Sequence, residues 1–417
     1  MMSKLNFRVG AAALVASLFF YSCSQEEERT VEEAVFTELD GNFDSQVIKG
    51  QYIVVYRNGA VEDMGSKFPN NYAKAQEGMK AQTNSILSKA SINNAEIVNV
   101  YSNTLNGATL RLSDDQVEIL KKSKEVAYIE QDRIVTFAPP SCGTGNTPPC
   151  TGDGGGGGGT TTQETPYGIL RVNGVANYTG TGVAWILDSG IDLDHPDLNV
   201  NSSRGFNAFT SGRDGGSLDD GNGHGTHVAG TIAALNNSIG VIGVAPGATV
   251  IPVKVLDSRG SGSYSGVIAG VDFVGANGKS GDVANMSLGG PVSLALDDAV
   301  KNAASKGTKF VLAAGNESTD ANNSSPARAN GANIYTVSAM NSSDSWASFS
   351  NYGNPPVDYA APGVSIKSTW KSGGYNTISG TSMASPHAAG VLLLGAARTD
   401  GTVKNDPDGT ADPIIIH

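Results

Sequence analysis

Short apolar runs alternate with helical patterns over the larger, C-terminal part of the chain. Near-continuous apolar strands separated by helices are typical of a parallel sheet that is covered on both faces. We therefore expect an α/β domain over residues 163–397, doubly wound and mostly parallel, whose ligands bind at the carboxyl ends of the strands. The predicted strands are 182–187, 249–255, 283–286 and 309–313, and the predicted helices are 226–235, 264–276 and 294–306.

A smaller region, residues 50–138, shows a different order of elements. Strands and helices follow one another as β-α-β-β-α-β, the ferredoxin-like split βαβ arrangement, so we expect a small α+β domain. Ser113, with Gln116 three residues later, predicts a capping box at the start of the second helix. Because many functions share this fold, the order alone assigns none. The predicted strands are 51–57, 96–101, 108–112 and 126–130, and the predicted helices are 72–90 and 114–122.

Segments of biased composition flank these regions. Residues 139–162 contain two Pro-Pro pairs and six consecutive glycines. Such a segment cannot bury a core, and we expect it to be a linker between the two domains. Residues 398–417 are expected to be a C-terminal tail. Its acidic stretch, residues 406–412, misses the EF-hand pattern of calcium ligands and is expected to be an exposed turn.

The N-terminus has the pattern of an export signal. Lys4 and Arg8 precede an apolar run over residues 9–20, which is shorter than a membrane-spanning helix requires and predicts a signal peptide over residues 1–22. The run ends at a small residue followed by Cys23, which resembles a bacterial lipobox. We therefore expect Cys23 to carry a lipid and residues 23–49 to be an acidic tether at the cell envelope, in the periplasm or on the cell surface. Ordinary signal cleavage, giving a secreted soluble protein, is the alternative.

The remaining cysteines form one possible disulfide pair. Without Cys23, the chain has one pair, Cys142 and Cys150, which in an oxidising compartment could close a small disulfide loop. Two free thiols are the alternative.

The formal net charge of −12 argues against nucleic acid as the main partner, because phosphate binding needs clustered Lys and Arg.

Two polar residues follow the first predicted strand of the larger region. Asp188 stands at its carboxyl end, where a buried acid can orient an imidazole, although a turn aspartate before glycine is the simpler interpretation. His224 lies between two glycines at the start of a helix, with an accessible ring. His227, one turn later, is expected to pack in the core. No H-E-x-x-H pattern is present, so we do not expect a zinc site.

Two further residues could act on a substrate carbonyl. Ser382 begins a predicted helix, where free backbone N–H groups and the positive dipole end suit an oxyanion, although Ser is also the usual N-cap. Pro386 is expected in the first helical turn, where its missing N–H has no helical partner. Asn316 follows the strand 309–313, and its amide can donate a hydrogen bond. A turn asparagine is the alternative.

The four segments together resemble the signature blocks of the subtilases. They read Asp188-Ser-Gly, His224-Gly-Thr-His-Val-Ala-Gly, Ala313-Ala-Gly-Asn and Gly380-Thr-Ser-Met-Ala-Ser-Pro-His, in the chain order Asp, His, Ser. The match is to the proteinase K and aqualysin-like branch. Residues 107–112 and 126–132 resemble the inhibitor-type propeptide of the same family.

This resemblance implies a serine endopeptidase that is made as a self-processing zymogen. Asp188 would orient His224, His224 would act as general base and Ser382 as nucleophile, and Asn316 would help to stabilise the oxyanion. No cofactor is required for this chemistry. The expected partners are protein or peptide substrates and the chain's own propeptide.

The resemblance also implies where a substrate would bind. Small residues suit recognition of an extended main chain by strand addition, and since no acid or base is evident among them, we expect an apolar or aromatic preference before the cut. Asp358 is the candidate for a structural calcium ion. The implied substrate-binding residues are Gly260, Ser261, Gly262, Ser287, Leu288, Gly289, Gly290, Ala313, Ala314 and Gly315.

Two other classes of protein would carry different sequence features. A non-catalytic surface binding protein on the same scaffold would lack a member of the triad or Asn316, and all four residues are present. A lipase-like α/β-hydrolase would carry a G-x-S-x-G elbow, which surrounds no serine in this sequence. The sequence therefore favours the protease.

Overall fold

The computed structural model describes residues 46–136, 162–175, 177–395 and 397–417. The expected signal peptide, Cys23, nearly all of the acidic tether, and the linker with Cys142 and Cys150 lie outside these ranges. Among the described residues, no helix is long and apolar enough to cross a membrane.

The smaller region forms an antiparallel sheet in the order β2-β3-β1-β4. The predicted capping box is confirmed, since the Ser113 side chain accepts from the Gln116 N–H and the Gln116 side chain accepts from the Ser113 N–H. Helices and strands share one hydrophobic cluster. The elements are β1 (Val47–Tyr56), α1 (Met64–Lys67), α2 (Tyr72–Lys89), β2 (Glu96–Tyr101), β3 (Gly107–Arg111), α3 (Asp114–Lys121) and β4 (Val126–Thr136).

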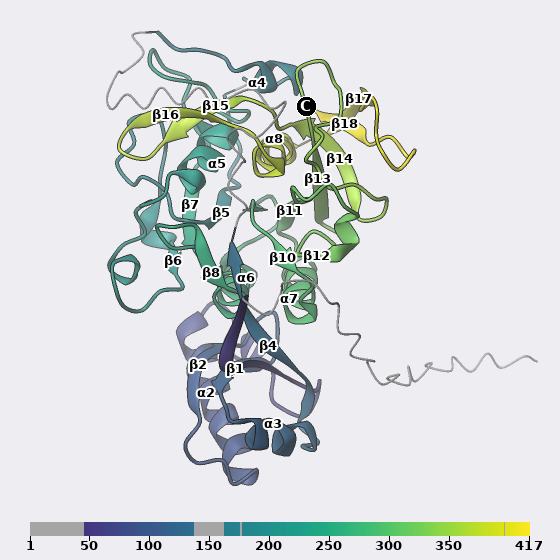
Figure 1. Ribbon diagram of the computed structural model, residues 1–417. Coiled ribbons are helices and arrows are strands. Elements are labelled where there is room, and N and C mark those ends of the chain that lie inside the picture. The colour runs from purple at the N-terminus through teal and green to yellow at the C-terminus, as the bar shows by residue number, and fades with distance from the viewer. Residues whose placement is uncertain (1–45, 137–161, 176, 396) are drawn as a thin grey trace, which may run out of the picture. The chain divides into compact units, whose positions relative to one another are not determined.

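The larger region is built on a nine-stranded sheet in the order β17-β18-β14-β13-β11-β9-β5-β7-β6 (Figure 1). All its pairs are parallel except β17 with β18, as expected for a doubly wound α/β domain. Its strands are β5 (Ala184–Asp188), β6 (Phe206–Asn207), β7 (Val250–Lys254), β9 (Val283–Met286), β11 (Lys309–Ala313), β13 (Ile334–Met340), β14 (Val357–Pro362), β17 (Arg398–Thr402) and β18 (Pro413–Ile416).

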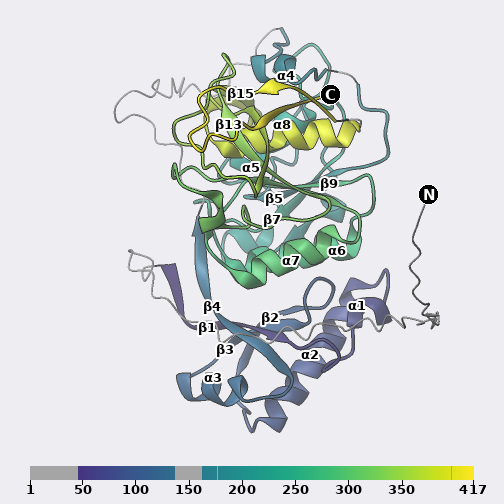
Figure 2. The ribbon, with the colours of Figure 1, turned by 90° about the vertical axis from the view of Figure 1, so that its right-hand side faces the viewer.

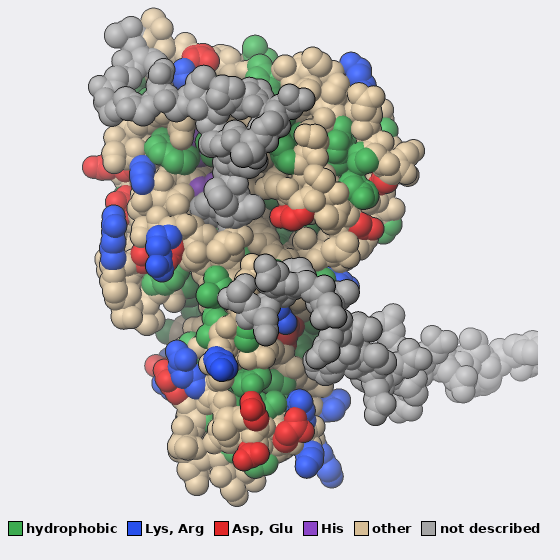
Figure 3. Space-filling model, viewed as in Figure 1, with side chains coloured by type: hydrophobic (Ala, Val, Ile, Leu, Met, Phe, Trp, Pro, Cys, Tyr) green, Lys and Arg blue, Asp and Glu red, His purple; other side chains and the backbone are tan. Residues whose placement is uncertain are grey.

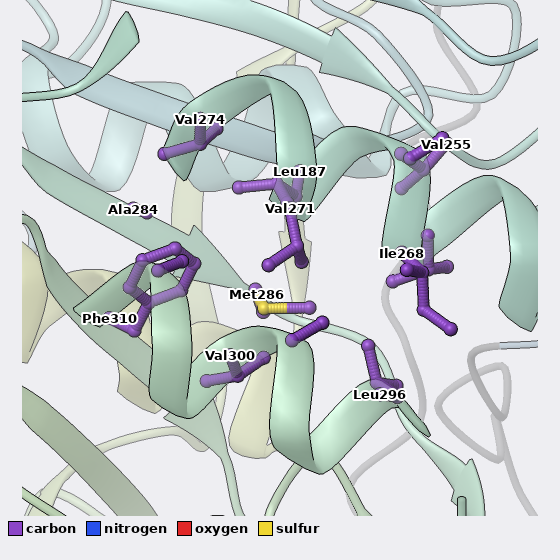
Figure 4. Packing of buried hydrophobic residues seen from close by; sticks show 14 of the residues in the cluster. Leu187, Val255, Ile268, Val271, Val274, Ala284, Met286, Leu296, Val300 and Phe310 are labelled. Atoms are coloured by element: carbon purple, nitrogen blue, oxygen red, sulfur yellow. The ribbon is translucent and has the colours of Figure 1, made fainter. Parts of the chain in front are cut away.

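Helices cover both faces of this sheet. In Figure 2, α5 and α8 lie on one side of the strands, and α6 and α7 lie on the other. Figure 4 shows how the second layer packs: Val271 of α6 and Val300 of α7 point toward Leu187, Met286 and Phe310 of the strands. The helices are α4 (Tyr167–Arg171), α5 (His224–Ala233), α6 (Tyr264–Asn277), α7 (Leu294–Ala304) and α8 (Thr381–Leu394).

Short strands complete the domain outside the main sheet. β15 (Ile366–Trp370) and β16 (Gly374–Ile378) form a hairpin, and β10 (Gly290–Pro291) pairs with β12 (Ser324–Ser325). β8 (Ser261–Ser263) pairs with β4 of the smaller region. This pairing explains why β4 runs to Thr136, six residues beyond its predicted end.

The C-terminal residues differ from the expected tail. They form the hairpin β17–β18, and β18 pairs with β14, so that the main sheet is extended at this edge. The acidic stretch is not uniformly exposed either. Asp412 is 1% exposed and accepts hydrogen bonds from Ser338 and Asn354, because the turn folds back onto the sheet.

Candidate active site

Asp188 and His224 meet at the carboxyl end of β5. The Nδ1 atom of His224 lies 2.9 Å from each carboxylate oxygen of Asp188, and the two residues are 4% and 0% exposed, respectively. An added Cβ at Gly225 would lie 2.1 Å from the Gly190 carbonyl oxygen, so only glycine lets α5 approach the strand this closely. Gly223 has φ of +115°, a conformation that glycine adopts without strain.

Ser382 is the second residue of α8, with Gly380 at the N-cap position. Its hydroxyl donates to the Ser287 carbonyl at 3.2 Å, and the Ser287 hydroxyl donates to the Ser382 carbonyl at 2.8 Å. Pro386 is inside the helix, beyond the first turn where we expected it. Because Pro386 has no N–H for the carbonyl four residues earlier, the Ser287 hydroxyl supplies that donor to Ser382.

Asn316 and the N-terminus of α8 present two donors to one place. The Asn316 side-chain oxygen accepts from the Thr381 N–H at 2.9 Å and from the Thr381 hydroxyl at 3.0 Å, which fixes the amide orientation. A Cβ added at Gly380 would lie 3.6 Å from the Ser382 nitrogen and 3.7 Å from Asn316 Nδ2. The two donor nitrogens therefore both lie next to Gly380, whose lack of a side chain leaves room beside them.

A pocket opens beside these donors. Most of the predicted substrate-binding residues line it, so the structure brings together segments that follow different strands. Thr136, the last residue of β4, also reaches this pocket. The lining residues include Leu288, Gly289, Gly290, Ala313, Ala314, Gly315, Asn316, Glu317, Thr381 and Ser382.

The end of β4 lies on the segment predicted to bind an extended substrate. Val135 is opposite Gly262 and Thr136 is opposite Ser261 in an antiparallel register. The Val135 side chain is fully buried and reaches within 3.7 Å of the place that a Cβ at Gly290 would occupy. The strand addition expected for a substrate is thus made by the chain's own smaller domain.

Glu317 lines the pocket and was not among the predicted substrate-binding residues, as was also the case for Ser324, Ala327 and Thr381. Glu317 is exposed at the pocket, and its Oε2 accepts from the Asn316 N–H at 2.9 Å and from Asn351 Nδ2 at 2.7 Å. An acid therefore stands at the pocket, although none of the predicted substrate-binding residues is itself acidic. The position of Glu317 directly after Asn316 was the available signal.

Four predicted substrate-binding residues lie outside the pocket lining: Ser261 and Gly262, which pair with β4, and Ser287 and Gly260. The Ser287 side chain is fully buried and contacts Ser382 and Ser385, so it supports the α8 N-terminus. Gly260 precedes β8 in a turn with φ of +80°, where its N–H donates to the Asp257 carbonyl. Neither residue lines the pocket.

Asp358 is the predicted calcium ligand, and its side chain offers one carboxylate. Burial raises its pKa to about 6, and one oxygen accepts from the Thr336 N–H at 2.9 Å. Within the described ranges, no group of three or more acidic, His or Cys side chains could hold a metal ion. Within these ranges Asp358 is thus not part of a cluster of acidic side chains, and a calcium ion there would need carbonyl oxygens or waters as its other ligands.

The second histidine of the His224 block packs as expected. His227 is fully buried, and its Nε2 lies 2.9 Å from the Ile366 carbonyl oxygen. Burial lowers the pKa of His227 to about 3, so the ring is neutral and serves the core of the domain.

Two family models match this chain: the subtilase family over residues 179–404, and peptidase inhibitor I9 over residues 51–138. The first match spans more than half of the chain. The chain belongs to the subtilase family. The expected resemblance, the α/β fold and the inhibitor-type region before it are thereby confirmed.

Individual subtilases agree with the family match. The chain is 41% identical to alkaline serine exoprotease A of Vibrio alginolyticus, over 84% of this chain and 61% of that protein. It is 40% identical to an extracellular serine proteinase of Thermus sp. (strain Rt41A), over 93% of this chain and 89% of that protein. A crystal structure of a cold adapted subtilisin-like serine proteinase matches with a TM-score of 0.53 and 42% identity, over 60% of this chain and 96% of that chain.

Figure 3 displays the surface of one face of this subtilase. Lys and Arg side chains are interspersed there with Asp and Glu side chains, and they do not gather into one basic patch.

Proposed function

We propose that this subtilase is an exported serine endopeptidase that uses Asp188, His224 and Ser382 as its triad. The observation that carries the proposal is the buried Asp188–His224 pair, with Nδ1 2.9 Å from both carboxylate oxygens, in a domain whose cleft is lined by Ser382 and Asn316. The donor nitrogens of Ser382 and Asn316 both lie next to Gly380. These groups supply the base, the nucleophile and the oxyanion donors that peptide hydrolysis needs.

The reaction runs in two halves. The Ser382 hydroxyl oxygen bonds to the scissile carbonyl carbon while its proton passes to His224, and Asp188 stabilises the imidazolium that forms. The negative oxygen of the tetrahedral intermediate accepts from the Ser382 N–H and from Asn316 Nδ2. The C–N bond then breaks as His224 returns the proton to the leaving amine, and water repeats the sequence on the acyl-enzyme.

An inhibitor assay tests this chemistry. We expect a serine-directed acylating inhibitor to abolish endopeptidase activity and a zinc chelator to leave it largely intact. Ser382→Ala serves as the control for the site of acylation. Processed protein that cleaves peptides while insensitive to the acylating reagent would exclude the triad.

We further propose that the domain formed by residues 50–138 is an inhibitory propeptide. Besides the β4–β8 pairing, three carboxylates connect it to the catalytic domain, and two of them, Asp132 and Asp272, are fully buried. Glu130 accepts from the Ala295 N–H at the start of α7, and Asp132 accepts from the Ser265 N–H at the start of α6. Asp272 of α6 accepts from the N–H groups of residues 102–104. Carboxylates are favoured at helix N-termini, so the contacts of Glu130 and Asp132 suit a tightly held inhibitor.

We propose that the enzyme cuts this domain from itself, and the position of β4 supports this proposal. Since Thr136 reaches the pocket, the proposed cut lies beyond it, between residues 137 and 163. Ser382→Ala should accumulate as the uncut precursor, which N-terminal sequencing and mass spectrometry detect. Normal maturation of Ser382→Ala with no other protease present would exclude self-processing.

The location of the enzyme rests on residues outside the described ranges. We propose export with a lipid on Cys23, and a disulfide between Cys142 and Cys150. Mass spectrometry of the exported protein tests both, and an unmodified Cys23 would favour a secreted soluble enzyme. A structural calcium ion at Asp358 stays a prediction that the single carboxylate does not support.

A further inference from the structure

Lys254 is a buried cation beside the catalytic aspartate. It is the last residue of β7, directly opposite Asp188 in the parallel pairing of β5 with β7, and it is 1% exposed. Lysine is almost never fully buried unless its charge is paired and its donors are used. A fully buried lysine at this position therefore needs an explanation.

The ammonium group of Lys254 uses its donors on three neighbours. Nζ donates to the Ser189 carbonyl at 2.6 Å and to the Leu256 carbonyl at 3.2 Å, and it forms an ion pair with Asp214 at 3.2 Å. The Phe209 ring lies below it, 5.9 Å from Nζ to the ring centroid. An ammonium has three N–H donors, so these three polar contacts satisfy it.

Two of these contacts bear on Asp188. Ser189 directly follows Asp188, and its N–H donates to an Asp188 carboxylate oxygen at 2.7 Å. Lys254 holds the carbonyl of the same Ser189. The Asp188 carbonyl, in turn, accepts from the N–H groups of Val255 and Leu256, and Leu256 is the other residue whose carbonyl Lys254 holds. Lys254 thus contacts the turn after Asp188 on the β5 side, through Ser189, and on the β7 side, through Leu256.

We infer that Lys254 is a positioning residue for the proposed triad. It holds the Asp188–Ser189 turn so that both Asp188 oxygens stay on His224 Nδ1. The inference rests on the proposed function, since it assigns Lys254 to the same catalytic site. Lys254 touches neither substrate nor nucleophile and acts only through Asp188.

Other charged groups face this site and belong in the test. Asp214 is the ion-pair partner of Lys254, and Asp220 accepts from the Ser189 hydroxyl at 2.9 Å and from the N–H groups of Gly223 and Thr226 at the start of α5. Removing Lys254 alone would leave Asp214 without its cation. The informative variant is therefore the double change Lys254→Met with Asp214→Asn, which removes both charges together.

The expected effect of the double variant is on turnover. We expect kcat to fall about 10- to 100-fold with KM within about twofold, because Asp188 acts in the transition state and not in substrate binding. The single variant Asp214→Asn keeps the two carbonyl contacts of Lys254. It should therefore retain kcat within about threefold.

Val253→Ala is the matched control for stability. Val253 is the neighbour of Lys254 in β7, it is opposite Leu187 in β5, and it is fully buried. It should lower Tm at least as much as the double variant while keeping kcat. This control separates a loss of positioning from a general loosening of the two strands.

The measurements are kcat, KM and Tm, together with the rate of acylation by the serine-directed inhibitor. Wild-type enzyme that is not acylated would refute the proposed function itself. Wild-type that is acylated, with a double variant that acylates and turns over at the wild-type rate, would refute only the role of Lys254. Should the double variant fail to fold, a kcat of Asp214→Asn that falls tenfold or more would refute the assignment of the positioning role to the two carbonyl contacts of Lys254.

Discussion

Asp272 offers a quantitative test of how the propeptide domain is held. This carboxylate of α6 is fully buried and accepts five hydrogen bonds from the propeptide. They come from the N–H groups of Ser102, Asn103 and Thr104 at 3.1, 2.8 and 2.7 Å, and from the side chains of Thr104 and Gln76 at 3.0 Å each. The perturbation is Asp272→Ala, which leaves three buried backbone N–H groups of the propeptide without an acceptor.

The magnitude follows from the chemistry of a buried carboxylate and its donors. Truncating one partner of a buried, hydrogen-bonded charge costs about 2–5 kcal/mol, much of it from the donors that stay desolvated. With 1.36 kcal/mol for each tenfold change, about 3 kcal/mol corresponds to a roughly 150-fold weaker inhibition constant. The catalytic constants of the mature enzyme should not change, because Asp272 is not among the residues that line the pocket.

The assay adds the isolated segment 50–138 to mature enzyme and follows peptide hydrolysis. The segment has a hydrophobic cluster of its own, which supports its use as a separate inhibitor. Asp298→Asn is the matched control, since Asp298 accepts a single hydrogen bond from Tyr128, at 2.8 Å. The inhibition constant of the segment for the Asp298→Asn enzyme should rise less than tenfold relative to the unchanged enzyme. An Asp272→Ala enzyme inhibited as tightly as the Asp298→Asn enzyme would refute this account.

Three further predictions concern the site and the inhibitor. Asn316→Ala should lower kcat by about 10²–10³ with little change in KM, a magnitude measured in subtilisin and not worked out from this structure; unchanged kcat would remove Asn316 from the oxyanion site. Glu317→Gln should slow cleavage after Lys relative to cleavage after Phe by about two- to fivefold, because an exposed carboxylate contributes little to a charge pair. An unchanged ratio of the two cleavage rates would show that Glu317 does not face the side chain before the cut. Burial raises the pKa of Glu130 and of Asp132 in the interface. The complex therefore binds protons that the separated domains release, and its added stability is complete below the ordinary carboxyl pKa of about 4 and lost as pH rises through the raised pKa values. The inhibition constant should increase from pH 5 to pH 8, and Glu130→Gln should flatten that slope; inhibition that tightens with pH would contradict the assignment.

Local sequence signals predicted the elements that depend on neighbouring residues. Ser113 and Gln116 form the capping box because both partners are three residues apart. The apolar runs that became β5, β7, β9 and β11 were found because a strand buried on both faces has no polar alternation to confuse the pattern. His227 was placed in the core from its helical spacing alone.

The missed features depend on contacts that are distant in sequence. β4 continues to Thr136 because β8, more than a hundred residues later, offers an edge to pair with. Pro386 is tolerated inside α8 because Ser287, on another strand's end, supplies the missing donor. β18 becomes a sheet strand because β14 leaves an edge open, which no pattern within residues 398–417 indicates.

The pairing of β4 with β8 has a consequence for the proteins this enzyme can attack. A partner that is held mainly through its backbone is recognised by its shape, since every sequence offers the same N–H and C=O groups. A chain must leave its own fold and become extended over several residues before it fits. Compact, rigid proteins would then resist the enzyme whatever their sequence, and loose loops or misfolded chains would be degraded first. Selection by local flexibility would thus protect the folded proteins around the enzyme.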